Sequence, residues 1–335
     1  MSQKLIAEGR IKYCDRIYEK GNTFLCLDDG EATELIRNKI ARAYPEPSPE
    51  VLARKAAEAA KFAEQPDPTK EPTPKPIYTI KEILGSKMYL REDDMGLSKD
   101  LMEHGIREEA STEYIQNILK PNWTVIDIGA NLGYYALLEA RRCKFVYAIE
   151  PVKSSFETLN KSIKLNKYKN IKTFQMAISN RNGLYDIAVS KKNNWSNMVN
   201  LNLLVDAHKE TLGKSFKEIQ KVQTIPLDDF AIWNNIRKIN FIRMDVEGYE
   251  VEIVEGMDKV FDLMPGGSYL TIEFHSILLK NREPFVKLLD KVTGAGFKVI
   301  CGTWVKSKFD LTQTELRERL YRGACFQAFF KKDEK

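Results

Sequence analysis

Asp127-Ile-Gly-Ala-Asn-Leu-Gly133 is the stretch of sequence that decides the fold of this chain. It follows the strand-like run Thr124–Ile128 and leads into the helix-like run Tyr134–Arg141. Glycine permits a tight turn from strand to helix, in which the backbone can approach a bound ligand closely. A second predicted strand, Phe145–Ile149, is followed by Glu150, whose carboxylate can accept hydrogen bonds from both hydroxyl groups of a ribose. The segment therefore predicts a nucleotide-type cofactor site.

The spacing of the glycines indicates which cofactor binds. Gly129 and Gly133 are separated by Ala130-Asn-Leu, so the segment lacks the G-x-G-x-x-G pattern in which a helix N-terminus cradles a dinucleotide pyrophosphate. A cofactor that has a ribose and no phosphate groups fits better, and S-adenosylmethionine is the obvious candidate. The same spacing disfavours an NAD-dependent dehydrogenase.

Strand-like and helix-like runs alternate from residue 125 to residue 330. The predicted strands are Val125–Ile128, Phe145–Ile149, Ile171–Met176, Phe241–Met244, Tyr269–Phe274, Phe297–Cys301 and Cys325–Phe330. Strands that alternate with helices predict an α/β fold, with a mostly parallel sheet covered by helices on both faces. Right-handed crossovers bring the turns after such strands to one edge of the sheet. The residues expected to meet there are Asp127, Glu150, Ala177, Asp245 and His275.

A proline-rich stretch divides the chain. Eight of the thirteen prolines fall in residues 45–76, of which 65–76 are expected to be an extended linker. Residues 1–64 are predicted to form a helical module, with one helix over Glu31–Ala43 and another over residues 48–64. This module could dock a partner, dimerise or capture substrate, or it could be a solvated appendage without chemistry.

Residues 77–335 are predicted to form the main domain. Its first part contains short strands and helices, expected at Tyr78–Ile83, Lys87–Arg91, Ser98–Glu103 and Thr112–Leu119. Residues 77–120 and 191–222 lie outside the alternating pattern, so we expect them to be lid or substrate-recognition elements. Trp195 in the second of these could stack on a ring, although packing against the sheet is the more common role of such a tryptophan.

The composition, with 43% apolar and 30% charged residues, is typical of a globular protein. No apolar run approaches the roughly 18 residues of a membrane span, and the first ten residues lack the apolar region of a secretory signal, so a cytoplasmic protein is expected. The five cysteines are scattered, which argues against a disulfide framework and against a structural zinc site. Clustered carboxylates with one histidine could hold magnesium, but no pattern requires a metal.

The net charge of +5 is modest and unevenly placed. Residues 1–78 carry 13 charges of each sign, so the excess belongs to the remainder of the chain. Nucleic-acid enzymes usually show a stronger basic stripe. The charge therefore neither demands nor excludes a phosphate-bearing substrate.

Three stretches match one known family. They are Val125–Tyr134 with Glu150-Pro151, Gln175–Ser179 through Asn182-Gly183, and Ile225–Phe230 followed by Ile242–Glu250. Together they resemble the FkbM-type S-adenosylmethionine-dependent methyltransferases, over roughly residues 80–302. Asp245-Val-Glu-Gly-Tyr-Glu250 is the most specific piece, because the glycine turn is shared by many class I methyltransferases. The resemblance implies their Rossmann-like fold, with a mostly parallel, seven-stranded sheet.

The resemblance also implies a set of cofactor-binding residues. The glycine turn should line the methionine and ribose end of the cofactor, with Asp127 near the methionine ammonium unless that carboxylate only stabilises the turn. Glu150 should bind the ribose hydroxyls. Asn180 stands near a position where many relatives carry an acid that recognises the adenine amino group. The implied set is Asp127, Gly129, Ala130, Asn131, Gly133, Glu150, Pro151, Ala177, Ile178 and Asp245.

Four residues at the expected edge of the sheet are candidates for catalysis. Asp245 and Glu247 follow a predicted strand, and strand alternation would point both side chains to the same side. Glu273 and His275 are two residues apart on the neighbouring strand and share a face. One of these groups could be the base that takes a proton from the methyl acceptor.

Only three histidines occur in the sequence. His104 and His208 lie in polar segments and are expected to be exposed. His275 is therefore the histidine to consider for general base catalysis or substrate contact, and a structural, hydrogen-bonded histidine is the equal alternative.

Methyl transfer from a sulfonium requires the acceptor and the methyl carbon to be held in line. A hydroxyl acceptor also requires a base, which the clustered carboxylates and histidine could supply. These features favour O-methylation of a small-molecule, sugar or lipid-linked hydroxyl. The alternatives are RNA or protein methylation, for which the sequence has no Asn-Pro-Pro-Tyr element and no recognisable RNA-binding module, and a non-catalytic scaffold that binds a partner through residues 1–76.

Overall fold

The computed structural model describes residues 77–190 and 216–334, together with residues 196–197 and five short strands before residue 44. The chain consists of two compact units, Met1–Lys75 and Pro76–Lys335. Every helix in the described part of the chain is too short or too polar to cross a membrane.

The first unit contains strands in the positions that are described. β1 (Gln3–Ala7) pairs antiparallel with β4 (Thr23–Cys26) and with β5 (Ala41–Ala43), and β2 (Ile11–Tyr13) pairs with β3 (Arg16–Tyr18). The expectation of a helical module is therefore wrong for these residues. β5 lies inside the helix expected at 31–43, where pairing with β1 outweighs the weak strand propensity of its alanines.

The rest of the two expected helices, residues 31–40 and 48–64, lies outside the described residues. The same holds for the expected linker at 65–76.

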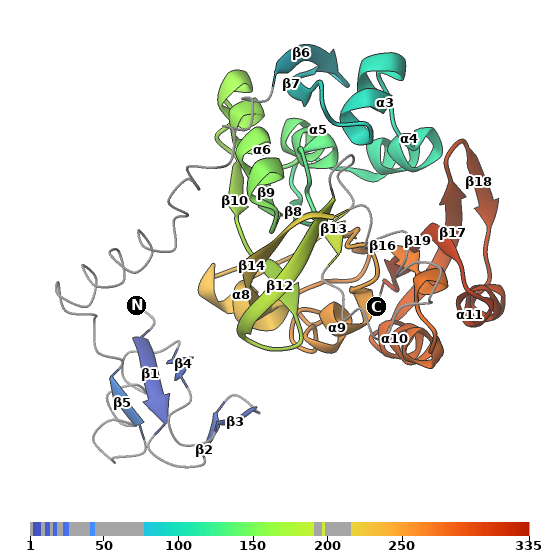
Figure 1. Ribbon diagram of the computed structural model, residues 1–335. Helices are drawn as coiled ribbons and strands as arrows, with labels where there is room; N and C mark the ends of the chain where they lie inside the picture. The colour runs from blue at the N-terminus through green and yellow to red at the C-terminus, as the bar shows by residue number, and fades with distance from the viewer. Residues whose placement is uncertain are drawn as a thin grey trace. The chain divides into compact units, whose positions relative to one another are not determined.

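The second unit is built on one large sheet, as predicted (Figure 1). The order of its strands is β10-β9-β8-β15-β16-β19-β17-β18. Neighbours from β10 to β16 are parallel, and the pairs β16–β19, β19–β17 and β17–β18 are antiparallel. The bounds are β8 Thr124–Ile128, β9 Phe145–Ile149, β10 Ile171–Phe174, β15 Phe241–Met244, β16 Tyr269–His275, β17 Phe297–Trp304, β18 Ser307–Asp310 and β19 Cys325–Lys332.

The sheet has eight strands and not the expected seven, because β17 continues through a tight turn into β18. Val305 in this turn has a positive φ of 49°. β18 reads Ser-Lys-Phe-Asp, with a single apolar residue, so its sequence carries almost no strand pattern. The other seven strands match the predicted ones.

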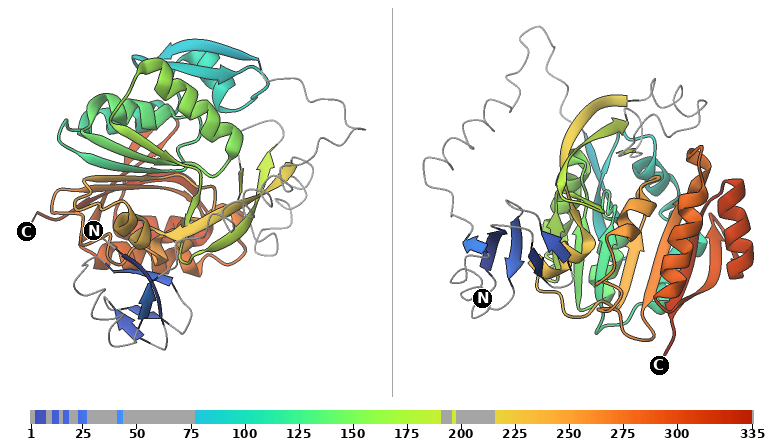
Figure 2. Two further views of the ribbon diagram at one scale, coloured as in Figure 1. Left: turned by 90° about the vertical axis from the view of Figure 1, so that its left-hand side faces the viewer. Right: turned by 90° about the horizontal axis from the view of Figure 1, so that it is seen from below.

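Alternate residues of the strands face opposite layers of helices. Ile126 and Ile242 join the core formed with α8, α9, α10 and α11, whereas Val125 and Phe241 join the core formed with α3, α4 and α5. Figure 2 shows the strands between these two layers. The helices are α3 Leu97–His104, α4 Glu109–Ile118, α5 Tyr134–Arg142, α6 Lys153–Asn166, α8 Leu227–Trp233, α9 Glu250–Glu255, α10 Glu283–Gly294 and α11 Gln313–Arg322.

Residues 77–120 form a cap that packs on the α5 side of the sheet. Its hairpin consists of β6 (Tyr78–Ile83) and β7 (Ser86–Arg91), close to the expected bounds, and α3 and α4 also fall where they were predicted. Leu90 and Leu101 of the cap share a buried apolar cluster with α5. The cap thus rests on the same helix that follows the glycine turn.

A second, smaller sheet lies beside the main one and has the order β11-β14-β12-β13. Its strands are β11 Ala177–Ser179, β12 Gly183–Ser190, β13 Ser196–Asn197 and β14 Phe216–Pro226. Residues 216–222 of the expected recognition insert are therefore part of β14, which pairs antiparallel with β12. Residues 191–195 and 198–215, with Trp195 and His208, lie outside the described part of the chain.

Candidate active site

The glycine turn after β8 packs directly against the chain at residue 245. Gly129 has a φ of +85°, and a Cβ atom there would lie 1.8 Å from the carbonyl oxygen of Asp245. A side chain at this position would therefore clash with backbone, which cannot move aside cheaply. The turn also anchors to β9, since the amides of Gly129 and Ala130 both donate to the carbonyl of Ile149 at 3.0 Å.

A cavity of about 620 Å³ opens at this turn. Most of its wall is apolar, and Asn131, Glu150, Asp245 and Glu247 supply the charged and amide groups. Such a wall, apolar with a few placed polar groups, is typical of a small-molecule site. The lining residues are Ile128, Gly129, Asn131, Ile149, Glu150, Pro151, Val152, Met176, Ala177, Ile178, Ile187, Asp245, Val246, Glu247, Tyr249 and Ile253.

Glu150 is buried at the end of β9 with its carboxylate held in place. One oxygen accepts from the amide of Asn131 and the other from the amide of Val152, both at 2.8 Å. Burial raises the pKa of Glu150 to about 7, although the two amide donors oppose the shift. A carboxylate oxygen that accepts one amide can still accept a hydroxyl group, because each oxygen has further acceptor capacity.

A second cavity, of about 470 Å³, adjoins the first. The two cavities share Gly129, Asn131, Asp245 and Glu247 in their walls. The second is more polar, and the cap contributes to it. Its other lining residues are Leu97, Arg107, Glu108, Ala130, Tyr134, Tyr135 and Arg243.

Arg243 on β15 joins two carboxylates beneath the second cavity. It donates to Asp127 at 3.2 Å and to Asp245 at 2.9 Å, and its guanidinium lies 4.0 Å from the ring centre of Tyr135. Burial would raise the pKa of Asp245, but the positive charge of Arg243 lowers it. Asp245 therefore presents a carboxylate to both cavities.

Asp127 was expected near the methionine ammonium or as a carboxylate that only stabilises the turn. Its side chain is fully buried and is not among the described residues that line either cavity. Its partner is Arg243, its neighbour in the strand register, and burial raises its pKa. Asp245 lines both cavities, whereas Asp127 pairs with Arg243, which the sequence reasoning missed. A lone arginine inside the apolar run Phe241-Ile-Arg-Met244 was the available signal.

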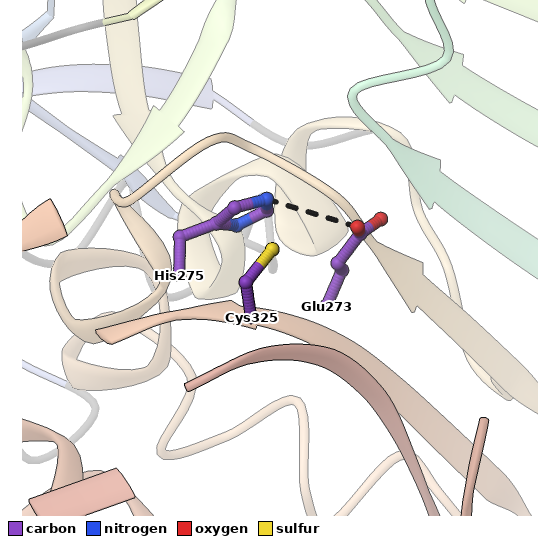
Figure 3. A group of neighbouring side chains, drawn as sticks. All are labelled: Glu273, His275 and Cys325. Carbon is purple, nitrogen blue, oxygen red and sulfur yellow. Dashed lines mark ion pairs between the residues drawn. The ribbon is translucent and has the colours of Figure 1, made fainter. Parts of the chain in front are cut away.

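His275 lies at the end of β16, and Figure 3 shows it next to the carboxylate of Glu273. Its Nδ1 lies 2.7 Å from Glu250 Oε1, and its Nε2 lies 3.3 Å from Glu247 Oε2 and 3.8 Å from Glu273 Oε1. Burial would lower the pKa of His275, but the negative charges of Glu247 and Glu250 raise it well above its ordinary value. The structure thus brings the expected His275, Glu247 and Glu273 together, and Glu250 was missed as their partner.

Glu247 reaches the cavities from a loop and not from a strand. β15 ends at Met244, and Glu247 and Gly248 both have a positive φ, of 54° and 101°. Strand alternation was therefore the wrong reason to place Asp245 and Glu247 on the same side, because Glu247 is not in a strand. Both side chains nevertheless line the same two cavities. Burial raises the pKa of Glu247 to about 7, despite the opposing charge of His275.

Three other residues considered in the sequence are absent from the described walls of both cavities. Gly133 is the N-cap residue of α5 and is not among the described lining residues. The side chain of Asn180 donates to Glu255 at 2.7 Å on the surface. His104 is exposed, as predicted, with 68% of its side chain accessible.

The side chains of three cysteines lie in the described part of the chain. Cys143 and Cys301 are buried and free, and Cys325 is free and partly buried. Cys325 lies beside His275, a proximity that the sequence reasoning did not anticipate.

A model of the FkbM methyltransferase domain matches residues 127–299, more than half of the 335-residue chain. The chain belongs to the FkbM methyltransferase family. The expected family, and with it a methyltransferase domain that uses S-adenosylmethionine, is confirmed. The match begins at Asp127 of the glycine turn and includes Asp245, Glu247, Glu273 and His275.

Known proteins similar to this FkbM-family chain are distant. "Methyltransferase 1" of Beauveria bassiana is 22% identical over 151 residues, which cover 40% of this chain and 58% of that relative. This chain thus spans little more than half the length of the curated relative it matches.

Two similar solved structures have low sequence identity to this chain. An rRNA methylase from Streptococcus thermophilus is 11% identical, with a TM-score of 0.40 over 67% of this chain and 95% of its own. A methyltransferase FkbM from Methylobacillus flagellatus is 14% identical, with a TM-score of 0.38 over 65% of this chain and 50% of its own.

Proposed function

We propose that this FkbM-family chain transfers the methyl group of S-adenosylmethionine to a hydroxyl oxygen of a small-molecule, sugar or lipid-linked acceptor. The observation that carries the proposal is the pair of adjoining cavities, which share Gly129, Asn131, Asp245 and Glu247. A transferase needs two ligands in contact at one point, and a shared wall between two cavities supplies that arrangement.

The first cavity suits the adenosine part of the cofactor. Glu150 would accept the ribose hydroxyls, and the apolar segment Met176–Ile178 would border the adenine ring. The methionine end would extend along Gly129 toward Asp245. The Asp245 carboxylate, fixed by Arg243, would pair with the ammonium group.

The second cavity would hold the acceptor. Glu247 lines both cavities, so its carboxylate lies where an acceptor hydroxyl would meet the methyl group. In the transfer the hydroxyl oxygen forms the new bond to the methyl carbon as the carbon–sulfur bond breaks, and the hydroxyl proton passes to a base. Glu247 would take this proton, with Glu273 and His275 as its neighbours. Alignment of the two ligands can contribute up to about 7–11 kcal/mol to the rate enhancement.

The test is a transfer assay with methyl-labelled S-adenosylmethionine. The full chain is incubated with extracts separated into metabolites, lipids, RNA and protein, and Glu247→Gln serves as the matched variant that binds cofactor without a base. Label in the metabolite or lipid fraction, lowered about 100-fold or more by the variant, supports the proposal. Label in RNA or protein alone favours a macromolecular acceptor, and cofactor binding without any transfer favours a scaffold.

A further inference from the structure

Two neighbouring strands place a histidine, a cysteine and a carboxylate side by side. In the antiparallel register of β16 and β19, His275 lies opposite Cys325, and Glu273 lies opposite Gln327. All four residues occupy the same face of the sheet, because residues two apart on a strand share a face. Figure 3 shows the imidazole, the thiol and the Glu273 carboxylate close to one another. Their donor atoms lie within 4.8 Å of one another.

The imidazole is held in the orientation that metal-binding histidines adopt. Its Nδ1 lies 2.7 Å from Oε1 of Glu250, a fully buried carboxylate. A carboxylate on one ring nitrogen fixes the ring and the tautomer, and it directs the other nitrogen to the metal. Here the other nitrogen, Nε2, is the one that lies near Glu273 and Glu247.

The spacing of the donors fits a tetrahedral ion. Two donor atoms that bind one zinc ion at about 2.0–2.3 Å lie about 3.3–3.6 Å apart. His275 Nε2 is 3.8 Å from Glu273 Oε1 and 3.3 Å from Glu247 Oε2, so small side-chain movements would suffice. The donors of Glu273, His275 and Cys325 come from paired strands, which hold their positions more rigidly than loops do.

Carboxylates outnumber positive groups at the cluster, and a buried amide nearby has no described hydrogen-bond partner. Three carboxylates, Glu247, Glu250 and Glu273, surround the single imidazole. Gln327, opposite Glu273, is 3% exposed, and neither atom of its amide has a hydrogen-bond partner among the described residues. Glu250 is paired with His275, whereas the partly exposed Glu247 and Glu273 share the same imidazole, and a buried amide normally has partners. A cation with a bound water would meet both needs.

We propose that Glu273, His275 and Cys325 form a binding site for a divalent transition-metal ion of the zinc type. A thiolate and an imidazole select zinc over magnesium, which prefers an all-oxygen set. Three protein ligands leave one position for water or for Glu247, as in zinc sites that hold an exchangeable group. Since Glu247 lines both cavities, the ion would lie next to the acceptor site.

Metal binding can be measured without any methyl acceptor. The full chain is stripped with a chelator and titrated with Zn²⁺ by calorimetry, and then with Co²⁺ by absorption spectroscopy. We expect one tightly bound ion and a thiolate-to-cobalt charge-transfer band. Cys325→Ser should abolish the band, and Cys325→Ser, Glu273→Gln and His275→Asn should each weaken Zn²⁺ binding by about 100-fold or more.

Cys143→Ala is the matched control, because Cys143 is buried outside the cluster. It should leave the zinc affinity and the cobalt spectrum unchanged. Circular dichroism of the metal-free variants shows whether each is folded, and the wild-type titration tests the site even where a variant is not. No Zn²⁺ binding by the wild type, or binding that survives all three ligand substitutions, would overturn the proposal. Failure of methyl transfer alone would bear on the proposed function and not on this site.

Discussion

At the scale of single residues, the site contains carboxylates whose pKa values are set by different neighbours. Asp245 is kept charged by Arg243, whereas Glu150 is held by amides alone and has its pKa raised to about 7. A buried carboxylate that is costly to ionise is expected where ligand binding compensates for the cost. Ionisation of Glu150 should therefore lower the stability of the free protein and strengthen cofactor binding.

Replacing Glu150 by Gln tests this opposition. The folded protein holds the Glu150 proton more tightly than the unfolded chain does, since the pKa rises from its ordinary 4.5 to about 7. The folded state therefore loses stability as the pH rises from 4.5 to 7, by up to about 3 kcal/mol. Glu150→Gln cannot ionise, and its NH2 group cannot accept the second backbone amide, so the variant starts from a lower stability at pH 4.5. Without cofactor, the wild type should lose stability relative to the variant by up to about 3 kcal/mol between pH 4.5 and pH 8. Denaturant unfolding across this range measures the difference.

The same variant should bind S-adenosylmethionine about 10–100-fold more weakly, because hydrogen bonds to a charged acceptor contribute about 1.5–3 kcal/mol. Calorimetry at pH 8 measures the affinity. Wild-type affinity in Glu150→Gln would show that this carboxylate does not hold the ribose.

Arg243→Met tests the buried ion pairs. The substitution leaves Asp127 buried without its cation, and breaking a buried pair in this way destabilises a protein by about 3–5 kcal/mol. The double variant with Asp127→Asn removes the stranded charge and should recover part of that loss, which urea unfolding of the single and double variants measures. Equal stability of Arg243→Met and the double variant would contradict the assigned pairing.

Sequence reasoning found the clustered acidic and histidine residues better than the residues that hold them. Asp245, Glu247, Glu273 and His275 were all placed at one site, because the ends of parallel strands meet at one edge. Their partners Arg243 and Glu250 were missed. Pairing between side chains on different elements follows from the register of the sheet and from the loop conformation at Glu247, and neither is encoded in local sequence pattern.

At the scale of elements, the turn between β8 and α5 sets the geometry of both cavities. It combines three positive φ angles, at Gly129, Asn131 and Gly133, with close packing on the chain at Asp245. The sequence predicted this turn correctly because glycine spacing is a local signal. It missed β18, and it predicted helix where β5 is found, because both strands exist through pairing with a neighbour.

Gly129→Ala tests the turn. A Cβ atom at 1.8 Å from the Asp245 carbonyl oxygen, with φ at +85°, forces the turn and the loop after β15 apart. We expect S-adenosylmethionine affinity to fall by at least about 100-fold and the thermal midpoint to drop, since such strain costs several kcal/mol. Gly294→Ala is the matched control, because a Cβ atom at Gly294 meets no atom within 4 Å. Gly294→Ala should be neutral or slightly stabilising. If it destabilised the protein as much as Gly129→Ala does, the clash with Asp245 would not be the cause of the loss.

At the scale of the whole molecule, the chain joins an FkbM methyltransferase domain to a separate N-terminal unit. The alternation of strands and helices was enough to predict the large sheet and the edge where its functional residues meet. The N-terminal unit gave no comparable pattern, and the strands described there are only three to five residues long. Short strands of this kind depend on their partners for stability.

The cavity between the glycine turn and Glu150 is predicted to bind S-adenosylmethionine. Calorimetric titration of the full chain at pH 8 tests it most directly, with Gly129→Ala as the variant in which the cavity wall is displaced. We expect the wild type to bind one cofactor per chain with a dissociation constant on the order of 1 μM to 1 mM. Gly129→Ala should show no binding. No binding by the wild type, or equal binding by both proteins, would contradict it.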